Sequence, residues 1–322
     1  MRRLALLFLA AACTPADHWS RPLDSLSSVP LSVWESPQKH LYAVGGPLGS
    51  PGTPLFLRYD GSWRKSAVDG AFTLWWIFGF GEDDLYTVGE VGTILHYDGS
   101  TFTPETSGTD ATLYGIWGTA ADDLWAVGGH PNSDGVILHR DADGWHSVAV
   151  AENTGSFFKV WGSATDDVFV CGQEGTILHF DGSAWTAQDS GAGHSSLFTL
   201  AGRGPSEVYV VGGDGLPVAL KYDGQKWSSV VDPVLEHASS LTGVSVATDG
   251  RVIFVGQDGT KLRGRPGALI DDSDQTPRTD LHGAIFVGNE IFAVGGNYNT
   301  PAGAQRIGVV DHFGGDISST LR

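Results

Sequence analysis

The chain has 322 residues, of which 45 are glycine, 11% are aromatic and only 17% are charged. This mixture suits many short strands joined by tight turns, because aromatic side chains fill pleated surfaces and glycine tolerates turn conformations. The formal net charge of −18 repels phosphate backbones and anionic lipid surfaces, so we expect no nucleic-acid partner and no electrostatic membrane binding.

Residues 1–12 have the pattern of a targeting segment. Two arginines precede an apolar run over residues 4–12, which is too short to span a bilayer and has the length of a signal-peptide hydrophobic region. The alanines at 10–12, directly before Cys13, resemble the lipobox of bacterial lipoproteins. The resemblance implies cleavage before Cys13 and a lipid on its sulfur; an ordinary signal peptide cut nearby is the alternative.

This resemblance sets the expected domain organisation and location. We expect a lipoprotein signal peptide over 1–12, a tether over 13–16 and one folded domain over 17–322. The N-terminal lipid would be the only contact with the membrane. Thr14 after the lipidated cysteine favours the outer membrane over the inner one, and the sequence leaves open whether the domain faces the periplasm or the outside.

A frame that ends in glycine recurs seven times along the rest of the chain. It is clearest in IWGTAADDLWAVG (116–128) and VWGSATDDVFVCG (160–172), and a second motif such as GTILHYDGS (92–100) follows it. Each repeat therefore predicts four short strands in about 40 residues, which is the length of one propeller blade. The closing glycines are Gly45, Gly89, Gly128, Gly172, Gly212, Gly256 and Gly295.

The ends of the repeat array indicate how the ring closes. Trp19 precedes Trp34 by 15 residues, the spacing that also separates Trp63 from Phe78, so Trp19 occupies a fourth-strand position before the first repeat. The seventh repeat ends soon after its third strand. We therefore predict an all-β, seven-bladed β-propeller with four antiparallel strands per blade, in which the N-terminal strand completes the last blade and removes the open seam.

The glycine frames resemble the propeller repeats of bacterial secreted lipoproteins and, more distantly, Ycf48-like and BNR-type repeats. The resemblance covers nearly the whole mature chain. It implies the fold but not an activity, because propellers carry many unrelated functions.

Two sets of repeated residues suggest metal sites at first sight. The equivalent histidines His96, His139 and His179 lie on predicted third strands, about 10 Å apart between blades, which is too far to share a zinc ion. We expect these positions to be solvated or to lie between blades. The acidic pairs at 83–84, 122–123 and 166–167 are expected to fix turns, since no loop carries a full calcium-binding run. No metal and no cofactor are predicted.

The repeat explains ten of the eleven tryptophans as packing between blades, including Trp75, which is equivalent to Tyr114 and Phe158. Trp76 is the exception, because its equivalents are small, polar or charged. We therefore expect this position to face the central channel, where Trp76 and Lys159 would form a stacking-and-charge site at the mouth; space filling is the alternative. The equivalents are Ser32, Gly115, Lys159, Thr199, Gly243 and Gly283.

The loops between second and third strands differ most in length. Because strands alternate in direction, these loops and the loops between repeats are expected on one face, which is where repeat scaffolds place insertions that bind partners. Drift of the loops without any ligand is the alternative. The polar and aromatic candidates for this binding face are His130, Asn132, Asp134, Asp214, Asn297, Tyr298 and Asn299.

No catalytic signature accompanies the fold. The sequence lacks His-Glu-x-x-His, Gly-x-Ser-x-Gly, a phosphate-binding loop and the Ser-x-Asp-x-Gly boxes of BNR enzymes. We predict a monomeric, non-enzymatic, lipid-anchored extracytoplasmic scaffold that binds a protein or a glycan. The alternatives are a glycan-active hydrolase or lyase with an unrecognised site on the propeller face, and a purely structural surface protein.

Overall fold

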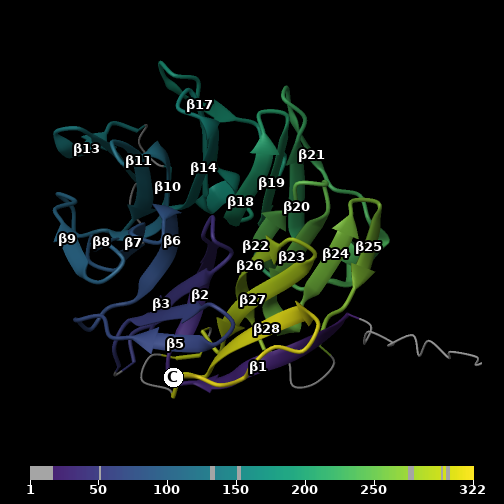
Figure 1. The fold of residues 1–322 in the computed structure, drawn as a ribbon. Helices are drawn as coiled ribbons and strands as arrows, with labels where there is room; N and C mark the ends of the chain where they lie inside the picture. Colours follow the sequence, from purple (N-terminus) through teal and green to yellow (C-terminus); the bar gives the residue numbers. More distant parts are fainter. Residues whose placement is uncertain are drawn as a thin grey trace, which may run out of the picture.

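The computed structural model describes residues 17–50, 52–130, 135–150, 154–274, 279–298, 300–301 and 305–322. These residues form seven antiparallel sheets of four strands each. Figure 1 shows the sheets around a common centre, with the first strand of each blade nearest the middle. No helix in the described ranges is long and apolar enough to cross a membrane.

Blades are numbered here along the chain, and each is given from its inner to its outer strand. Blade 1 contains β2 Val29–Glu35, β3 Leu41–Gly46, β4 Leu55–Tyr59 and β5 Trp63–Ser66, and blade 2 contains β6 Leu74–Gly81, β7 Asp84–Gly89, β8 Ile94–Tyr97 and β9 Phe102–Glu105. Blade 3 contains β10 Thr112–Ala120, β11 Asp123–Gly129, β12 Gly135–Asp141 and β13 Gly144–Val148. Blade 4 contains β14 Phe157–Ala164, β15 Asp167–Gly172, β16 Ile177–Phe180 and β17 Trp185–Gln188. Blade 5 contains β18 Leu197–Gly204, β19 Glu207–Gly212, β20 Val218–Tyr222 and β21 Trp227–Ser229. Blade 6 contains β22 Leu241–Val246, β23 Val252–Gly256, β24 Lys261–Arg265 and β25 Ala268–Asp271. Blade 7 contains β26 Leu281–Val287, β27 Glu290–Gly296, β28 Gly308–Gly314 and β1 His18–Leu26. Three 3₁₀ turns complete the described elements: η1 Gln173–Gly175, η2 Pro233–His237 and η3 Gln257–Gly259.

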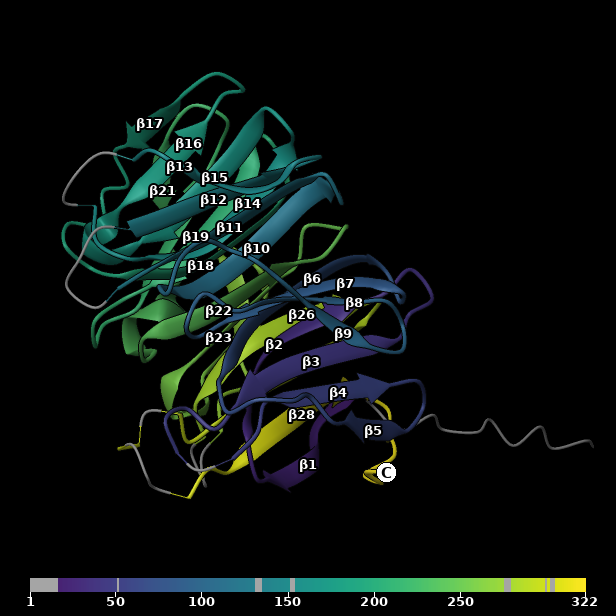
Figure 2. The same cartoon turned by 90° about the vertical axis from the view of Figure 1, so that its left-hand side faces the viewer.

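The N-terminal strand closes the ring as predicted. β1 pairs with β28 in antiparallel register, with Trp19 opposite Phe313 and Leu23 opposite Val310. Figures 1 and 2 both show β1 beside β28. Because the first strand completes the last blade, the two ends of the repeat array are joined by a hydrogen-bonded ladder and no open seam is left.

Charged side chains fasten this closing strand to the sixth blade. Arg21 in β1 lies 2.6 Å from Asp311 in β28 and 2.8 Å from Asp274 in the loop after β25. Lys261 in β24, which is 1% exposed, lies 2.7 Å from Asp274 and 2.9 Å from Asp311. The indole Nε1 of Trp19 donates to Asp272 at 2.8 Å. Two cations and two carboxylates thus neutralise one another at the closure, which buried charges require.

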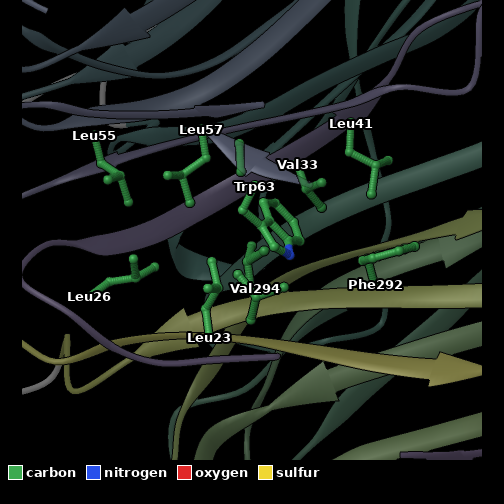
Figure 3. Packing of buried hydrophobic residues seen from close by; sticks show 11 residues of the cluster. Leu23, Leu26, Val33, Leu41, Leu55, Leu57, Trp63, Phe292 and Val294 are labelled. Atoms are coloured by element: carbon green, nitrogen blue, oxygen red, sulfur yellow. The ribbon is translucent and has the colours of Figure 1, made fainter. Parts of the chain in front are cut away.

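The hydrophobic core is divided among the contacts between neighbouring blades. Each cluster of buried side chains in the described residues combines strands of two adjacent blades. Figure 3 shows Trp63 of blade 1 in the middle of the cluster against blade 7, with Leu23 and Val294 on one side and Leu57 on the other. A single blade therefore has no core of its own, and burial is complete only when its neighbours are in place.

The repeated histidines and aspartates bind one another within a blade. His96, His139 and His179 lie 2.8, 2.8 and 2.7 Å from Asp84, Asp123 and Asp167, the second members of the acidic pairs. Each imidazole also stacks on the second-strand aromatic ring of its own sheet, at centroid distances of 4.5 Å to Tyr86, 4.1 Å to Trp125 and 4.2 Å to Phe169. The two sets of residues, analysed separately in the sequence, form one structural unit.

Replacement of Leu23 by alanine tests the closure. Leu23 is 6% exposed and packs between blades 7 and 1, so Leu23→Ala is expected to lower the free energy of unfolding by about 2–5 kcal/mol in urea titrations. The neighbouring Asp24 is exposed, and Asp24→Ala is expected to change the free energy of unfolding by less than about 0.5 kcal/mol. Equal effects of the two substitutions would contradict the proposed role of β1.

The turn between β16 and β17 gives a pH-dependent prediction. Hydrogen bonds from Ser183 and Ala184 lower the pKa of Asp181 to about 2. A lowered pKa in the folded state stabilises the fold above the unfolded value near 4, and this contribution is lost as the pH falls toward 2. Asp181→Asn should therefore have a lower melting temperature than the wild type at pH 7, and the difference should shrink between pH 4 and pH 2.

The control for this comparison is Asp122→Asn, at an exposed position of another turn. The difference in melting temperature between Asp122→Asn and the wild type should not shrink between pH 4 and pH 2. A gap between Asp181→Asn and the wild type that stays constant down to pH 2 would show that the carboxylate does not carry the effect.

Candidate functional site

Each inner strand carries a β-bulge near its start, on the side of the central channel. In blade 2 the pairing passes from Leu74 opposite Gly89 to Trp76 opposite Val88, so Trp75 has no partner in the ladder. The same step occurs in all seven blades. A bulge interrupts the alternation of side chains and can turn one residue toward a site. The bulged residues are Leu31, Trp75, Tyr114, Phe158, Phe198, Thr242 and His282.

This bulge adds a second role to the packing predicted for Trp75. Trp75, Tyr114 and Phe158 were expected to pack between blades, and their rings do contact one another from blade to blade. All three also line a cavity at the mouth of the channel. Strict alternation along the strand would have turned them elsewhere, and one unpaired residue shifts that alternation. The alignment of the repeats therefore holds, and what it did not predict is that these rings also face the cavity.

The aromatic rings among the bulged residues, together with Tyr298 from the loop after β27, form a curved row of contacting rings. We call this row the aromatic collar: Tyr298, His282, Trp75, Tyr114, Phe158 and Phe198. Successive ring centroids along this row lie 5.4, 5.8, 5.1, 5.5 and 5.6 Å apart. With Leu48, Lys159, Thr242 and Gln257 the collar encloses a cavity of about 320 Å³. A mostly apolar cavity of this size, with a few polar groups, has the properties of a small-ligand site.

Lys159 brings an uncompensated amine to this cavity. Its side chain is 2% exposed, and its Nζ donates to the carbonyl of Tyr114 at 3.3 Å and lies 3.0 Å from the ring centroid of Trp76. Burial lowers the pKa of Lys159 well below its ordinary value. Within the described part of the chain, no carboxylate lies within 4 Å of this amine. Trp76 does not line the cavity and packs toward the cluster between blades 2 and 3.

His282 adds a neutral imidazole to the lining of the cavity. Burial, with a smaller contribution from the nearby Lys159, lowers the pKa of His282 to about 4, although a hydrogen bond to Leu31 opposes the shift. The Nδ1 of His282 lies 2.6 Å from the Leu31 carbonyl oxygen. Because a carbonyl can only accept, Nδ1 carries the proton and Nε2 remains an acceptor.

Arg306 holds two loops at the rim of the cavity. Its guanidinium is 4% exposed and donates to the carbonyls of Pro47 at 3.1 Å, Leu48 at 2.6 Å and Asn297 at 3.0 Å. These bonds join the loop after β3 to the loop after β27. Leu48 and Tyr298, which line the cavity, are thereby positioned by a residue that the sequence analysis did not single out.

The loops predicted to share a face do so. The loops between second and third strands hydrogen-bond the loops between blades, for example Glu90 N to Thr73 O at 3.1 Å and Gly213 N to Ser196 O at 2.9 Å. We call the surface formed by these two sets of loops the loop face. The mouth of the channel, with Tyr298 and Gln257, opens in its middle.

The predicted binding residues that the structure describes are spread over this face. Tyr298 lines the cavity together with Lys159, whereas His130 pairs with Asp110 at 3.3 Å and Asp214 accepts from the Ser196 amide at 2.9 Å. Asn297 uses its amide within its own loop, donating to Gln305 O at 2.9 Å and accepting from Ile307 N at 2.8 Å. His130, Asp214 and Asn297 do not line the cavity. Cys13, Asn132, Asp134 and Asn299 lie outside the described residues.

The described residues of the loop face combine exposed apolar side chains with exposed carboxylates. Val91, Leu216, Val231 and Ile307 are 73, 78, 84 and 45% exposed. Arg306 is buried, and the described residues of these loops include no exposed lysine or arginine. The exposed carboxylates belong to Asp69, Asp110, Glu174, Asp189, Asp214, Glu236 and Asp258.

Comparison with known proteins supports the fold. No family model matches the chain, and no curated protein matches its sequence. Among solved structures, virginiamycin B lyase from Staphylococcus aureus has a TM-score of 0.73 at 11% identity, over 91% of this chain and 99% of that one. Ycf48 bound to D1 peptide has a TM-score of 0.69 at 13% identity, over 94% of this chain and 100% of that one. The WD40 propeller of Doa1 has a TM-score of 0.68 at 14% identity, over 91% of this chain and 96% of that one.

At these identities the likeness shows the propeller fold and leaves the activity open. The neighbours include both an enzyme and propellers that are not described as enzymes.

Two buried lysines give a matched pair of stability predictions. Lys159→Met removes an amine that has no counter-ion and keeps the side-chain volume, so the free energy of unfolding should stay unchanged or rise by about 1 kcal/mol or more. Lys261→Met leaves Asp274 and Asp311 short of a cation, so it should lower the free energy of unfolding by about 3–5 kcal/mol. Urea titrations measure both, and a large loss in Lys159→Met would assign that lysine to the scaffold.

Proposed function

We propose that this protein is a monomeric, non-enzymatic scaffold outside the cytoplasm that holds a protein partner on its loop face. The observation that carries the proposal is the composition of that face, where large apolar side chains project among carboxylates without an exposed lysine or arginine in the described loops. Single exposed apolar residues are ordinary, but several on one face around a hollow are typical of an interaction surface.

Val91 is the most telling of these residues. It has a φ of 56°, and at the equivalent positions of the other short turns Glu174 and Asp258 have φ values of 55° and 56°. A β-branched side chain is strongly disfavoured in this left-handed conformation. Neither turn geometry nor contact with water favours valine here, so a partner that covers Val91 gives a reason for it.

The charge of the face indicates the chemistry of the partner. A surface whose exposed charged side chains, in the described loops, are carboxylates attracts a segment rich in lysine or arginine. The apolar side chains then contact the aliphatic stems and neighbouring residues of that segment. The structure of Ycf48 with D1 peptide supports a peptide-binding role for a propeller of this shape.

The path of β1 fits display from a lipid anchor. His18 at the start of β1 pairs with Gly314, and Leu26 at its end pairs with Gly308, so the strand runs toward the loop face and starts at the opposite face. A lipid on Cys13, as the lipobox resemblance implies, would therefore be attached at the far side. The loop face would point away from the membrane, preferably the outer membrane.

Two observations favour other ligands or roles. The aromatic collar offers stacking surfaces of the kind that hold sugar rings, which favours a glycan. The neutral His282, with Nε2 free to accept a proton, favours a glycan-active hydrolase or lyase. Turnover of a glycan by the purified protein, abolished in His282→Ala, would replace the scaffold proposal by the enzyme one.

The test of the proposal is selection from a displayed peptide library followed by substitution on the loop face. Selected peptides should be enriched in lysine and arginine, and the double variant Val91→Asn with Leu216→Ser should bind them about tenfold or more weakly. Asparagine tolerates the left-handed conformation, so this variant should not lose stability.

The matched control is Ile270→Asn, because Ile270 is 50% exposed but lies on β25 at the outer edge of blade 6. It should leave peptide binding unchanged. Acidic or uncharged selected peptides, or equal losses in both variants, would refute a basic partner on the loop face.

A further inference from the structure

The strongest unexplained feature of the molecule is the amine of Lys159 at the mouth of the channel. Lys261, the other lysine with almost no exposure among the described residues, has two carboxylates within 3 Å, whereas Lys159 has a backbone carbonyl and the face of an indole ring. An ammonium group has three N–H donors, and a buried charge without a counter-ion is costly. The fold keeps such a group beside an open cavity instead of an apolar side chain.

The surroundings of this amine indicate the shape of a missing anion. Six of the ten residues that line the cavity belong to the aromatic collar, and Thr242 and Gln257 add polar side chains to the lining. A second donor in the lining, the indole Nε1 of Trp75, is buried and has no acceptor among the described residues. The site thus combines flat apolar walls with an amine whose acceptor is a neutral carbonyl and, among the described residues, an indole N–H that has no acceptor.

We propose that the channel mouth binds an organic acid, with its carboxylate on the Nζ of Lys159 and its flat apolar body against the aromatic collar. The site is distinct from the protein-binding surface proposed above, since it lies inside the channel and needs no macromolecular partner. Either a free acid or the carboxylate at the end of a polypeptide supplies this chemistry.

A carboxylate fits the site better than the other common ionic groups. A phosphate has a higher charge and more oxygen atoms, and it is usually held by several cationic or backbone N–H donors, whereas one amine faces this cavity. A cationic ligand could stack on the collar, but its positive charge would then lie against the amine of Lys159, which offers N–H donors and disfavours a cation. One negative charge on an apolar body matches one amine within a ring of aromatic side chains.

Binding of an acid in this geometry should be coupled to uptake of a proton. Burial holds the pKa of Lys159 low in the empty site, and a carboxylate at the amine favours the charged form. The titratable groups facing the amine are His282, whose pKa is about 4, and Cys171, whose pKa burial raises to about 12. Burial also raises the pKa values of Tyr114 and Tyr298, so none of the four titrates near neutral pH.

The experiment is calorimetric titration of the full-length protein with three probes of one shape: 2-naphthoate, 2-naphthamide and 2-naphthylmethylamine. Naphthoate should bind about tenfold or more tightly than the amide, because a charge-assisted hydrogen bond contributes more than a neutral one. The same titration is repeated at mildly alkaline pH in buffers of different ionisation enthalpy. These should show that the protein takes up close to one proton for each naphthoate that binds.

The variant that tests the assignment is Lys159→Met, with Lys221→Met as its matched control. Lys221 lies on β20 beside Glu207 and Tyr209, away from the cavity. Lys159→Met should bind naphthoate and naphthamide with equal affinity, and its binding of naphthoate should not be accompanied by proton uptake. Lys221→Met should behave as the wild type. Melting curves establish that both variants are folded.

A short peptide that ends in tryptophan, with a free or an amidated C-terminus, distinguishes the two sources of the acid. Binding of only the free-ended peptide, at least as tight as that of naphthoate, assigns the site to a chain end; binding of naphthoate alone assigns it to a small acid. The proposal is overturned if naphthoate does not bind at millimolar concentration, if the amide or the amine binds as tightly, or if the preference survives in Lys159→Met. These results leave the peptide selection on the loop face unaffected.

Discussion

Burial between neighbouring blades is the interaction on which the rest of the structure depends. Every buried cluster is shared by two adjacent sheets, so each blade is stable only inside a closed ring. The contact between blades 7 and 1 is therefore indispensable, and there the N-terminal strand adds its ladder and Arg21 adds its pairs with Asp274 and Asp311. With the core placed between the blades, the loops and the channel are released for other uses.

The bulge repeated in each inner strand converts this scaffold into a site. It takes one residue per blade out of the ladder, and in blades 2 to 5 that residue is aromatic. His282 and Tyr298 extend the row in blade 7, and Arg306 fixes the adjoining loops. The site is thus built from equivalent backbone positions, and its individuality comes from residues that break the repeat, above all Lys159.

Lys159 and Lys261 show how context decides what a buried lysine does. The carboxylates around Lys261 compensate its charge and join blades 6 and 7, which is a structural role. Among the residues that the structure describes, no carboxylate compensates Lys159, which lies beside a cavity in the middle of an acidic, partly apolar face. The two properties of that face, its charge and its aromatic mouth, suit two different ligands and motivate the separate proposals of a basic protein segment and an organic acid.

The sequence by itself determined the number of blades, the four strands in each, the closure by Trp19 and the face on which the variable loops gather, because each follows from a period or from strand direction. It also marked Lys159 and Tyr298 as candidates. Only the tertiary structure decided that Trp75, and not Trp76, lines the cavity, since a one-residue bulge at Trp75 leaves no trace in the repeat and takes that residue out of the alternation of the strand. The pairing of His139 with Asp123, the clamp by Arg306 and the missing counter-ion of Lys159 likewise depend on contacts between residues far apart in the chain, which no local pattern records.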